Sequence, residues 1–383
     1  MDFDTDIAIV GGGPVGAALA LALRESCLRV RVLEARSPLA TTRDPRPIAL
    51  SHGGRLLLER LGAWQALTPT PISHIHVSQR GGFGRAALSA RDAGVPALGY
   101  VVDYSDVFTH LADAARDAGS DYRDRVRVTA IHRDDDGCRI DSALEGTTAT
   151  HRARLAVVAD GGDIDGLAPA KTIDYAQCAL TARVRTAQPH RNTAYERFTP
   201  DGPLALLPFG MEMALVWTLT PARAQWLTHA PENEFLAALR NAFGGRLGEF
   251  AQVTQRACYP LTLRYAAHTD AAHLVTIGNA AQTLHPVAGQ GFNLGLRDAW
   301  ELARILRATT PEAIANSELL RRFRAARRLD RIATAGTTHA LVRLFSNDWF
   351  AFGALRGAGM TLLGCVPPAR DFLARRMIFG THG

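Results

Sequence analysis

The N-terminal stretch DIAIVGGGPVGAALALALRESCLRVRVLEA constrains the fold of this chain more than any other segment. Residues 6–10 form a short apolar run that predicts a strand, and the small residues from about Pro14 predict a helix. The run LRVRVLEA predicts a second strand that ends at Glu34. A strand, a glycine-rich turn, a helix and a strand within about 30 residues make the βαβ unit that binds a dinucleotide. We therefore expect a nucleotide site at the N-terminus.

Gly11, Gly13 and Gly16 give the turn a GxGxxG pattern. Gly11 permits a tight turn, Gly13 lets the backbone approach a pyrophosphate, and Gly16 lets the helix pack closely on the strand. Free N–H groups at the helix start attract the anion. Glu34, 18 residues after Gly16, can accept hydrogen bonds from the ribose hydroxyls. The unit does not distinguish NAD from FAD, and a structural βαβ turn is the alternative.

Three later stretches narrow this choice. TTRDPRPIAL is an arginine-bearing loop, LAVVADGGDIDG ends a predicted strand in Asp160-Gly161, and GNAAQTLHPVAGQGFNLGLRD joins a strand to a helix. With the first motif, they resemble the class A flavoprotein aromatic hydroxylases, the para-hydroxybenzoate hydroxylase type. The resemblance is greatest to the ubiquinone-biosynthesis branch, in particular the 2-polyprenyl-6-methoxyphenol hydroxylases. It extends to the segments YERFTPDGPLALLPF, YPLTL, LVRLFSNDW and PPARDFLARR.

The resemblance implies a role for each matching residue. The glycine-rich turn binds the FAD pyrophosphate, Glu34 the adenosine ribose, and the strand around Val126 lies beside the adenine. Arg46, or Arg43 nearby, reaches the FAD, and Asp160-Gly161 matches a motif linked to FAD and nicotinamide binding. The implied cofactor-binding set is Gly11, Gly13, Pro14, Val15, Gly16, Glu34, Ala35, Arg36, Arg43, Arg46, Val126, Asp160, Gly161, Asn279, Pro286, Gly289, Gln290, Gly291, Phe292 and Asn293.

The segment from Pro286 to Asn293 matches the loop and helix start beneath the flavin ring. Reduced flavin carries negative charge near N1, which the unpaired N–H groups of a helix N-terminus can stabilise. Asn279 stands where the wider family has the ribityl-binding Asp, so it keeps an acceptor oxygen but loses the charge. Tyr104-Ser105 stands where many relatives have Asn-Arg, which puts one FAD contact in doubt.

The resemblance also implies the chemistry. FAD, reduced by NAD(P)H, would react with O2 to give a flavin C4a-hydroperoxide that hydroxylates the ring of a polyprenylated phenol. His285 is the best candidate for a general base that deprotonates the phenol, although an imidazole that merely anchors its loop is an equal alternative. Pro208 and Phe209 are expected to line the substrate pocket. No metal site is expected.

The expected fold is α/β: a Rossmann-like (GR2-type) FAD-binding domain with an inserted antiparallel β-sheet and a C-terminal helical segment. The FAD domain would take residues 1–71, 99–171 and 259–330. The substrate domain would take residues 72–98 and 172–258, because alternating segments such as MALVWTLT predict antiparallel strands. Residues 331–383 would form the helical segment.

Composition excludes several classes of protein. At 47% hydrophobic and 21% charged residues the chain is globular, and its acidic start shows no secretory signal. Five dispersed cysteines without a CxxC pair suggest reduced thiols, so the cytoplasm is the expected location, with peripheral association at the inner membrane left open. The net charge is +6, but no nucleic-acid motif accompanies it. The arginine-rich run 321–331 is either a solvated helix face or a patch for anionic lipid or an acidic partner.

Two other functions remain open. A flavin monooxygenase of a soluble phenol, or of another ring position of the ubiquinone precursor, would use the same motifs. A flavoprotein scaffold without catalysis is disfavoured by the complete flavin loop. A protein complex of ubiquinone biosynthesis is a further candidate partner.

Overall fold

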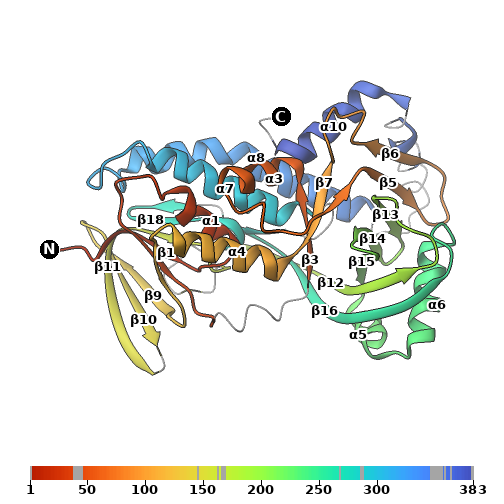
Figure 1. The fold of residues 1–383 in the computed structure, drawn as a ribbon, viewed down its shortest axis with the longest axis horizontal. Coiled ribbons are helices and arrows are strands. Elements are labelled where there is room, and N and C mark those ends of the chain that lie inside the picture. The colour runs from red at the N-terminus through yellow and green to blue at the C-terminus, as the bar shows by residue number, and fades with distance from the viewer. Residues whose placement is uncertain are drawn as a thin grey trace.

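Three sheets and the helices that cover them make up the computed structural model (Figure 1). The structure describes residues 2–37, 46–144, 146–161, 164, 170–266, 269–284, 289–345, 357, 359–362 and 365–380, with side chains up to residue 340 in the helix that ends at 345. The central strand of the first sheet, β1 (Thr5–Val10), pairs in parallel with β2 (Val30–Leu33) and with β11 (Thr147–Val158). The other strands of this sheet are β8 (Asp121–Arg123), β9 (Arg127–Arg133), β10 (Cys138–Leu144), β17 (Asp270–Ala271) and β18 (Leu274–Thr276).

Both faces of β1 are buried, which explains its continuous apolar run. Ile7 and Ile9 pack in the core formed with α1 (Pro14–Ala22), α4 (Tyr104–Asp117) and α7 (Gln290–Leu306). Ala8 and Val10 point the other way, into a core shared with β9 and β10. The strand order β18-β11-β1-β2-β8 is parallel throughout, as a βαβ-based nucleotide fold requires.

The second large sheet is antiparallel except for one pair of strands, β5 and β13. Its order is β19-β16-β12-β15-β14-β13-β5-β6. The strands are β5 (His74–Gln79), β6 (Arg85–Ser89), β12 (Ala170–Thr186), β13 (Thr193–Thr199), β14 (Gly202–Phe209), β15 (Glu212–Leu219), β16 (Phe250–Ala266) and β19 (Gln282–Thr283). A small third sheet, β3 (Pro47–Ser51), β7 (Gly99–Asp103) and β4 (Thr70–Ile72), lies beside it.

One face of the second sheet is covered by two helices, α5 (Pro221–His229) and α6 (Glu232–Phe243). Strands were expected throughout residues 172–258, so the structure corrects that expectation for 221–243. Phe235, Leu239 and Ala242 follow helical spacing and are buried against Leu204, Leu206 and Trp217 of the sheet. The opposite face of the sheet is therefore free to line a site.

The remaining helices lie together along the top of the molecule in Figure 1. They are α3 (His52–Arg60), α7, α8 (Ser317–Phe345) and α10 (Pro367–Phe379). Arg327 and Arg331 of α8 are buried, at 2% and 4% exposure, whereas Arg321, Arg322 and Arg328 are exposed. The arginine-rich run is thus only partly exposed, because its buried arginines form internal ion pairs and hydrogen bonds.

The expected α/β fold with an inserted antiparallel sheet is confirmed. None of the helices in the described part of the chain is both long enough and apolar enough to span a membrane.

Candidate active site

A cavity of about 1670 Å³ lies between the parallel sheet, the antiparallel sheet and the helices α7, α8 and α10. Pockets for one small molecule usually measure roughly 300–1,000 Å³. The cavity therefore has room for a dinucleotide and a second ligand. Its wall on one side is the glycine-rich turn after β1, and on the other it is the face of the antiparallel sheet that α5 and α6 leave uncovered.

The glycine-rich turn is shaped by contacts that no larger residue could make. Gly11 has φ +97°, and a Cβ there would come within 2.6 Å of the Asp160 backbone. A Cβ on Gly16 would lie 2.0 Å from the Gly11 carbonyl oxygen. A Cβ on Gly13 would meet only the Arg36 guanidinium, at 3.4 Å, and Gly13 lines the cavity. Two glycines thus close the turn, and the third exposes backbone to a ligand.

The first turn of α1 is an uncapped helix start that borders the cavity. Its N-cap, Gly13, offers no side-chain hydrogen bond, and the first turn holds no acidic residue. Pro14 and Val15 line the cavity beside it. Free N–H groups and the helix dipole favour an anion such as a pyrophosphate at this point.

Glu34 follows β2 and lies at the edge of the same cavity, 3% exposed. Its Oε2 accepts a hydrogen bond from the Gly12 N–H at 2.7 Å, and its Oε1 accepts from the N–H and Nε of Arg36 at 2.9 and 2.8 Å. A carboxylate offers about four acceptor positions, so Oε2 keeps one for a ribose hydroxyl. The Val126 N–H donates to the Glu34 carbonyl at 2.9 Å, which brings Val126 to the adenosine end of the cavity.

Tyr122 stabilises the glycine-rich turn through a hydrogen bond to its backbone. Its hydroxyl donates to the Gly12 carbonyl at 2.5 Å. Burial, together with the Glu34 carboxylate, raises the pKa of Tyr122, so the hydroxyl stays protonated and remains a donor.

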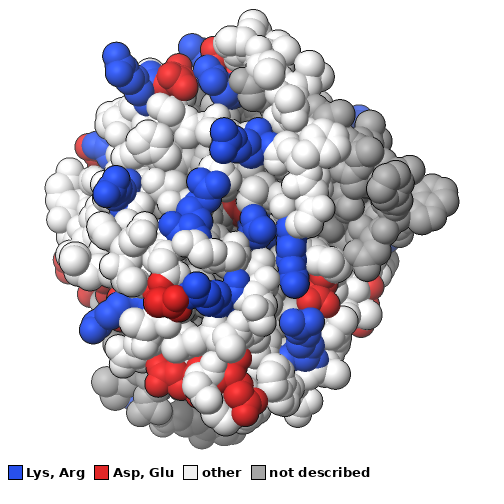
Figure 2. All heavy atoms as spheres, turned by 90° about the vertical axis from the view of Figure 1, so that its right-hand side faces the viewer, with Lys and Arg blue, Asp and Glu red and all other residues white. Residues whose placement is uncertain are grey.

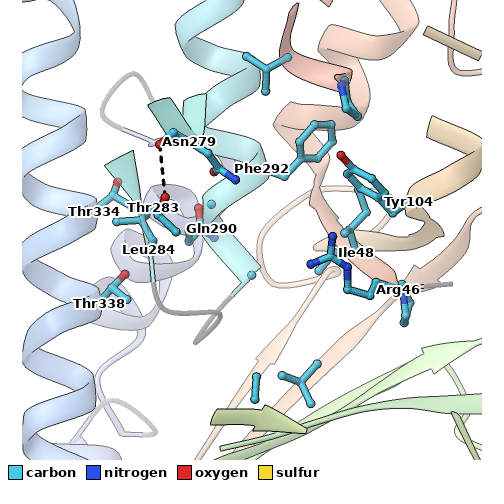
Figure 3. A pocket seen from close by; sticks show the side chains of 18 of the residues that line it. Arg46, Ile48, Tyr104, Asn279, Thr283, Leu284, Gln290, Phe292, Thr334 and Thr338 are labelled. Atoms are coloured by element: carbon cyan, nitrogen blue, oxygen red, sulfur yellow. Dashed lines mark hydrogen bonds between the residues drawn. The ribbon is translucent and has the colours of Figure 1, made fainter. Parts of the chain in front are cut away.

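The opposite end of the cavity is built by the 3-10 turn Gly278–Ala280 and by the start of α7 (Figure 3). Gly289 caps α7 with φ +59°, no side chain caps this end, and a Cβ on Gly291 would meet nothing within 4 Å. The exposed Asn279 side chain makes no hydrogen bond with the described residues. The Asn279 backbone carbonyl accepts a hydrogen bond from Thr283 Oγ1 at 3.3 Å. Its amide is available to a ligand.

Asn293 holds this end together and contributes no side chain to the cavity. Its Nδ2 donates to the Gly289 and Ala49 carbonyls at 2.9 and 3.0 Å, and its Oδ1 accepts from the Ser51 N–H at 2.8 Å. The side chain is 2% exposed. Asn293 therefore positions the start of α7 against β3.

Arg46, which was expected to reach the FAD, lies beside two tyrosines, and this arrangement was not visible in the sequence. The Arg46 guanidinium carbon lies 5.5 Å from the Tyr104 ring centre and 4.8 Å from that of Tyr259, and all three residues line the cavity. Ser105 thus stands at the position where an arginine is expected, and Arg46 supplies positive charge beside the neighbouring Tyr104.

Helix α8 adds a second unpredicted group. Thr334, Thr337 and Thr338 face the cavity across from Arg46, as Figure 3 shows for Thr334 and Thr338. Phe372, Leu373, Arg376 and Met377 of α10 also line the cavity.

Most of the predicted cofactor residues come together around the cavity. Those that line it are Gly11, Gly13, Pro14, Val15, Glu34, Ala35, Arg36, Arg46, Val126, Asp160, Gly161, Asn279, Gly289, Gln290, Gly291 and Phe292. Gly16 packs behind the turn. Arg43, His285 and Pro286 lie outside the described residues.

Pro208 and Phe209 do not line the cavity. Side chains alternate along β14, so Ala205 and Leu207 face the cavity while Leu206 and Pro208 face away from it. Phe209 lies at the end of the strand, with the Arg183 guanidinium 4.5 Å from its ring centre. The pocket wall is therefore formed by the neighbouring positions Ala205 and Leu207.

These residues fit FAD. The cavity provides an uncapped helix start, a carboxylate with a spare acceptor, an unpaired amide and a second helix start in one continuous space. When bound, FAD would supply the redox and oxygen chemistry, while the protein binds and orients it.

Comparison with known proteins agrees with this geometry. Residues 4–336 match the family described as "FAD binding domain". The chain is 36% identical to the ubiquinone hydroxylase UbiL of Rhodospirillum rubrum, over 97% of this chain and 88% of the relative. It is 32% identical to the 3-demethoxyubiquinol 3-hydroxylase of Escherichia coli, over 93% of this chain and 94% of the relative.

Solved structures share the fold. The p-nitrophenol 4-monooxygenase PnpA from Pseudomonas putida superimposes over all of both chains with a TM-score of 0.80 at 20% identity. The anhydrotetracycline hydroxylase OxyS from Streptomyces rimosus does so over 98% of this chain and 75% of its own, with a TM-score of 0.70 at 23% identity. The expected family and FAD cofactor are confirmed. With relatives above 30% identity across nearly its whole length, the protein belongs to the FAD-binding family that includes the ubiquinone hydroxylases.

Proposed function

We propose that the protein is an FAD-dependent monooxygenase that hydroxylates the aromatic ring of a polyprenylated phenol in ubiquinone biosynthesis, using O2 and reducing equivalents from NAD(P)H. The observation that carries this proposal is the continuity of the cavity. A dinucleotide cradle opens directly onto an apolar sheet face that includes Ile75, Ala205 and Leu207. The relatives named as ubiquinone hydroxylases support the substrate class. A 2-polyprenyl-6-methoxyphenol is our specific expectation for the substrate.

The side chains have three tasks in this proposal. The start of α1 and Glu34 hold the pyrophosphate and the ribose. The uncapped start of α7 would offer its N–H groups to negative charge on a bound flavin. The apolar wall keeps water away from the reacting centre and holds the ring in register.

Two measurements test the proposal. Protein purified gently should be yellow, with FAD recoverable in stoichiometric amount, and should consume NADH or NADPH faster when a prenylated methoxyphenol is added. The gene should restore ubiquinone in a strain that lacks a ring hydroxylase, with the intermediates followed by mass spectrometry. A colourless protein, or a rescued strain that changes a different ring position, would contradict respectively the flavin assignment and the expected regiochemistry.

We also propose that α10 meets a membrane surface. Phe372 of α10 is 71% exposed and also lines the cavity, and Leu362 and Val366, which precede this helix, are 62% and 36% exposed. The exposed Arg375 lies on the same helix, and basic side chains are spread over the upper and central part of the face in Figure 2. An apolar patch flanked by arginine suits an anionic bilayer and would give a lipid-tailed substrate direct entry.

Vesicle sedimentation tests this proposal. Wild-type protein should bind vesicles that contain phosphatidylglycerol, and Phe372→Asp should reduce binding several-fold. Met211→Asp is the matched control, because Met211 is 88% exposed but lies in the turn between β14 and β15 and does not line the cavity. Equal binding by all three proteins would refute the proposed contact.

A further inference from the structure

One row of side chains crosses the cavity face of the antiparallel sheet. The ladder pairs Ala86 with Val77, Val77 with Glu196 and Glu196 with Ala205. It continues from Ala205 to Val216 and from Val216 to Thr181. All six residues line the cavity, and Glu196 is the one ionisable group among them. A carboxylate has thus been placed in the middle of an otherwise uncharged wall.

Glu196 makes no hydrogen bond or ion pair with any described residue. Two other strand carboxylates are paired: Asp103 with Arg183 at 2.9 Å, and Glu212 with Arg185 at 3.8 Å. The adjacent Arg197 turns away, donating to the Ala242 carbonyl at 3.1 Å and to Ser78 Oγ at 3.3 Å. A carboxylate in an apolar wall costs folding free energy unless a partner compensates it, so its presence indicates that a ligand supplies the partner.

Among the described residues, the side chains clustered around Glu196 are apolar. Val77, Phe198 and Met360 form one cluster there, and Ala205 lies directly opposite. The charged residues that line the rest of the cavity come from the cofactor side and from α10, and none of them pairs with Glu196. Burial alone raises the pKa of Glu196 to about 7. The group therefore changes charge in the range where a general base is most effective.

We propose that Glu196 is a catalytic residue that accepts the proton of the substrate's phenol hydroxyl. The inference rests on the proposed function, because it requires a phenol in the cavity. The phenol O–H bond breaks, its proton passes to a carboxylate oxygen of Glu196, and the electron pair stays on the phenolate oxygen. No electron is gained or lost by the protein. The phenolate ring is the better nucleophile towards the electrophilic oxygen that the flavin supplies.

The test compares Glu196→Gln with Glu212→Gln in the FAD-bound enzyme, with 2-methoxy-6-prenylphenol as the probe. Both variants replace a carboxylate of the same sheet by an amide of equal size, but Glu212 does not line the cavity. For the wild type, kcat/KM should rise with pH through about 7, because the protonated carboxyl cannot accept a proton below that value. Glu196→Gln should lower the plateau by about 10²-fold or more and abolish this rise. Glu212→Gln should retain both.

Two further readouts separate proton transfer from a structural role. A more acidic probe, 2-methoxy-4-nitrophenol, ionises without help, so Glu196→Gln should lose far less activity with it. In substrate-free protein, a protonated-carboxyl infrared band that titrates near pH 7 should be missing from Glu196→Gln. FAD content should match the wild type, and thermal stability should be at least as high, because the amide removes the cost of a desolvated carboxylate.

The two proposals fail in distinguishable ways. A wild-type enzyme that hydroxylates neither probe refutes the proposed function. A wild type that hydroxylates the phenol, together with a Glu196→Gln variant that keeps its rate and its pH dependence, refutes the role of Glu196 alone. A variant that is equally slow with both probes also refutes proton transfer, since it would indicate only lost packing.

Discussion

Replacing Arg327 by Met should destabilise the protein strongly, because Arg327 is the centre of a buried ion network. Its Nε lies 2.7 Å from Asp298 and its Nη2 lies 2.8 Å from Asp330, with the side chains of all three residues at most 2% exposed. Arg297 completes the network through Asp330 at 2.8 Å. The network pairs two arginines with two aspartates, so the variant leaves both aspartates sharing one arginine.

The expected cost follows from that imbalance. Removing one partner of a buried ion pair costs about 3–5 kcal/mol, because the other charge stays desolvated. An unfolding entropy of about 2.1 cal/mol/K per residue gives roughly 0.8 kcal/mol/K for 383 residues, so Tm should fall by about 4–6 °C. Asp298 also accepts from Gln282 Nε2 at 2.8 Å and from the Gly278 N–H at 3.3 Å, beside Asn279. FAD should therefore be released more readily as well.

Denaturant unfolding and calorimetry of the apoprotein measure the loss, and FAD fluorescence measures release. Arg321→Met is the matched control on the same helix: Arg321 pairs with Glu318 at 2.6 Å, but both side chains are about 60% exposed. Such surface pairs contribute about 0–1 kcal/mol. If Arg327→Met lost no more stability than Arg321→Met, the buried ion network would not stabilise the fold as proposed.

Four more predictions address the cofactor site. Asn279→Asp should keep FAD bound at wild-type stoichiometry, because either side chain offers an acceptor to the ribityl chain; isolation of apoprotein would show that the neutral amide is required. Glu34→Ala should weaken FAD binding by roughly 10–100-fold, the loss of one or two charge-assisted hydrogen bonds, as measured by fluorescence titration. Gly16→Ala should give little folded protein, because its Cβ would lie 2.0 Å from a carbonyl oxygen. Gly291→Ala, whose Cβ meets nothing within 4 Å, should fold with an unchanged circular dichroism spectrum.

The nucleotide end of the site was predictable because its signals are local. The glycines, helix start and Glu34 lie within one βαβ unit, and their physical tasks fix their spacing. The structure adds what distant contacts determine. Asp160 is the residue whose backbone requires Gly11, and it lies 149 positions away along the chain. Tyr104 and Tyr259 are likewise far apart in the sequence, and both rings lie against the Arg46 guanidinium.

The arginine-rich run shows where sequence reasoning reached its limit. Arginine is seldom buried, so a run of six predicts a solvated or partner-binding face. Arg327 and Arg331 are one helical turn apart and face inwards, where Asp298 and Gln282 meet them from other elements. Nothing within residues 321–331 identifies those partners. By contrast, the spacing of Phe235, Leu239 and Ala242 was a visible helical signal for α6.

The antiparallel sheet explains both the misplaced pocket residues and the position of Glu196. Side chains alternate with a period of two, so each strand sends one set to the α5–α6 core and the other to the cavity. Leu204 and Leu206 fix this phase in β14, because a slip by one residue would expose them to the cavity. The cavity wall is therefore specified as firmly as the core behind it. The same core packing fixes the register that places Glu196 between Val77 and Ala205 on the cavity face. A strand without any catalytic motif can in this way present a base to a substrate.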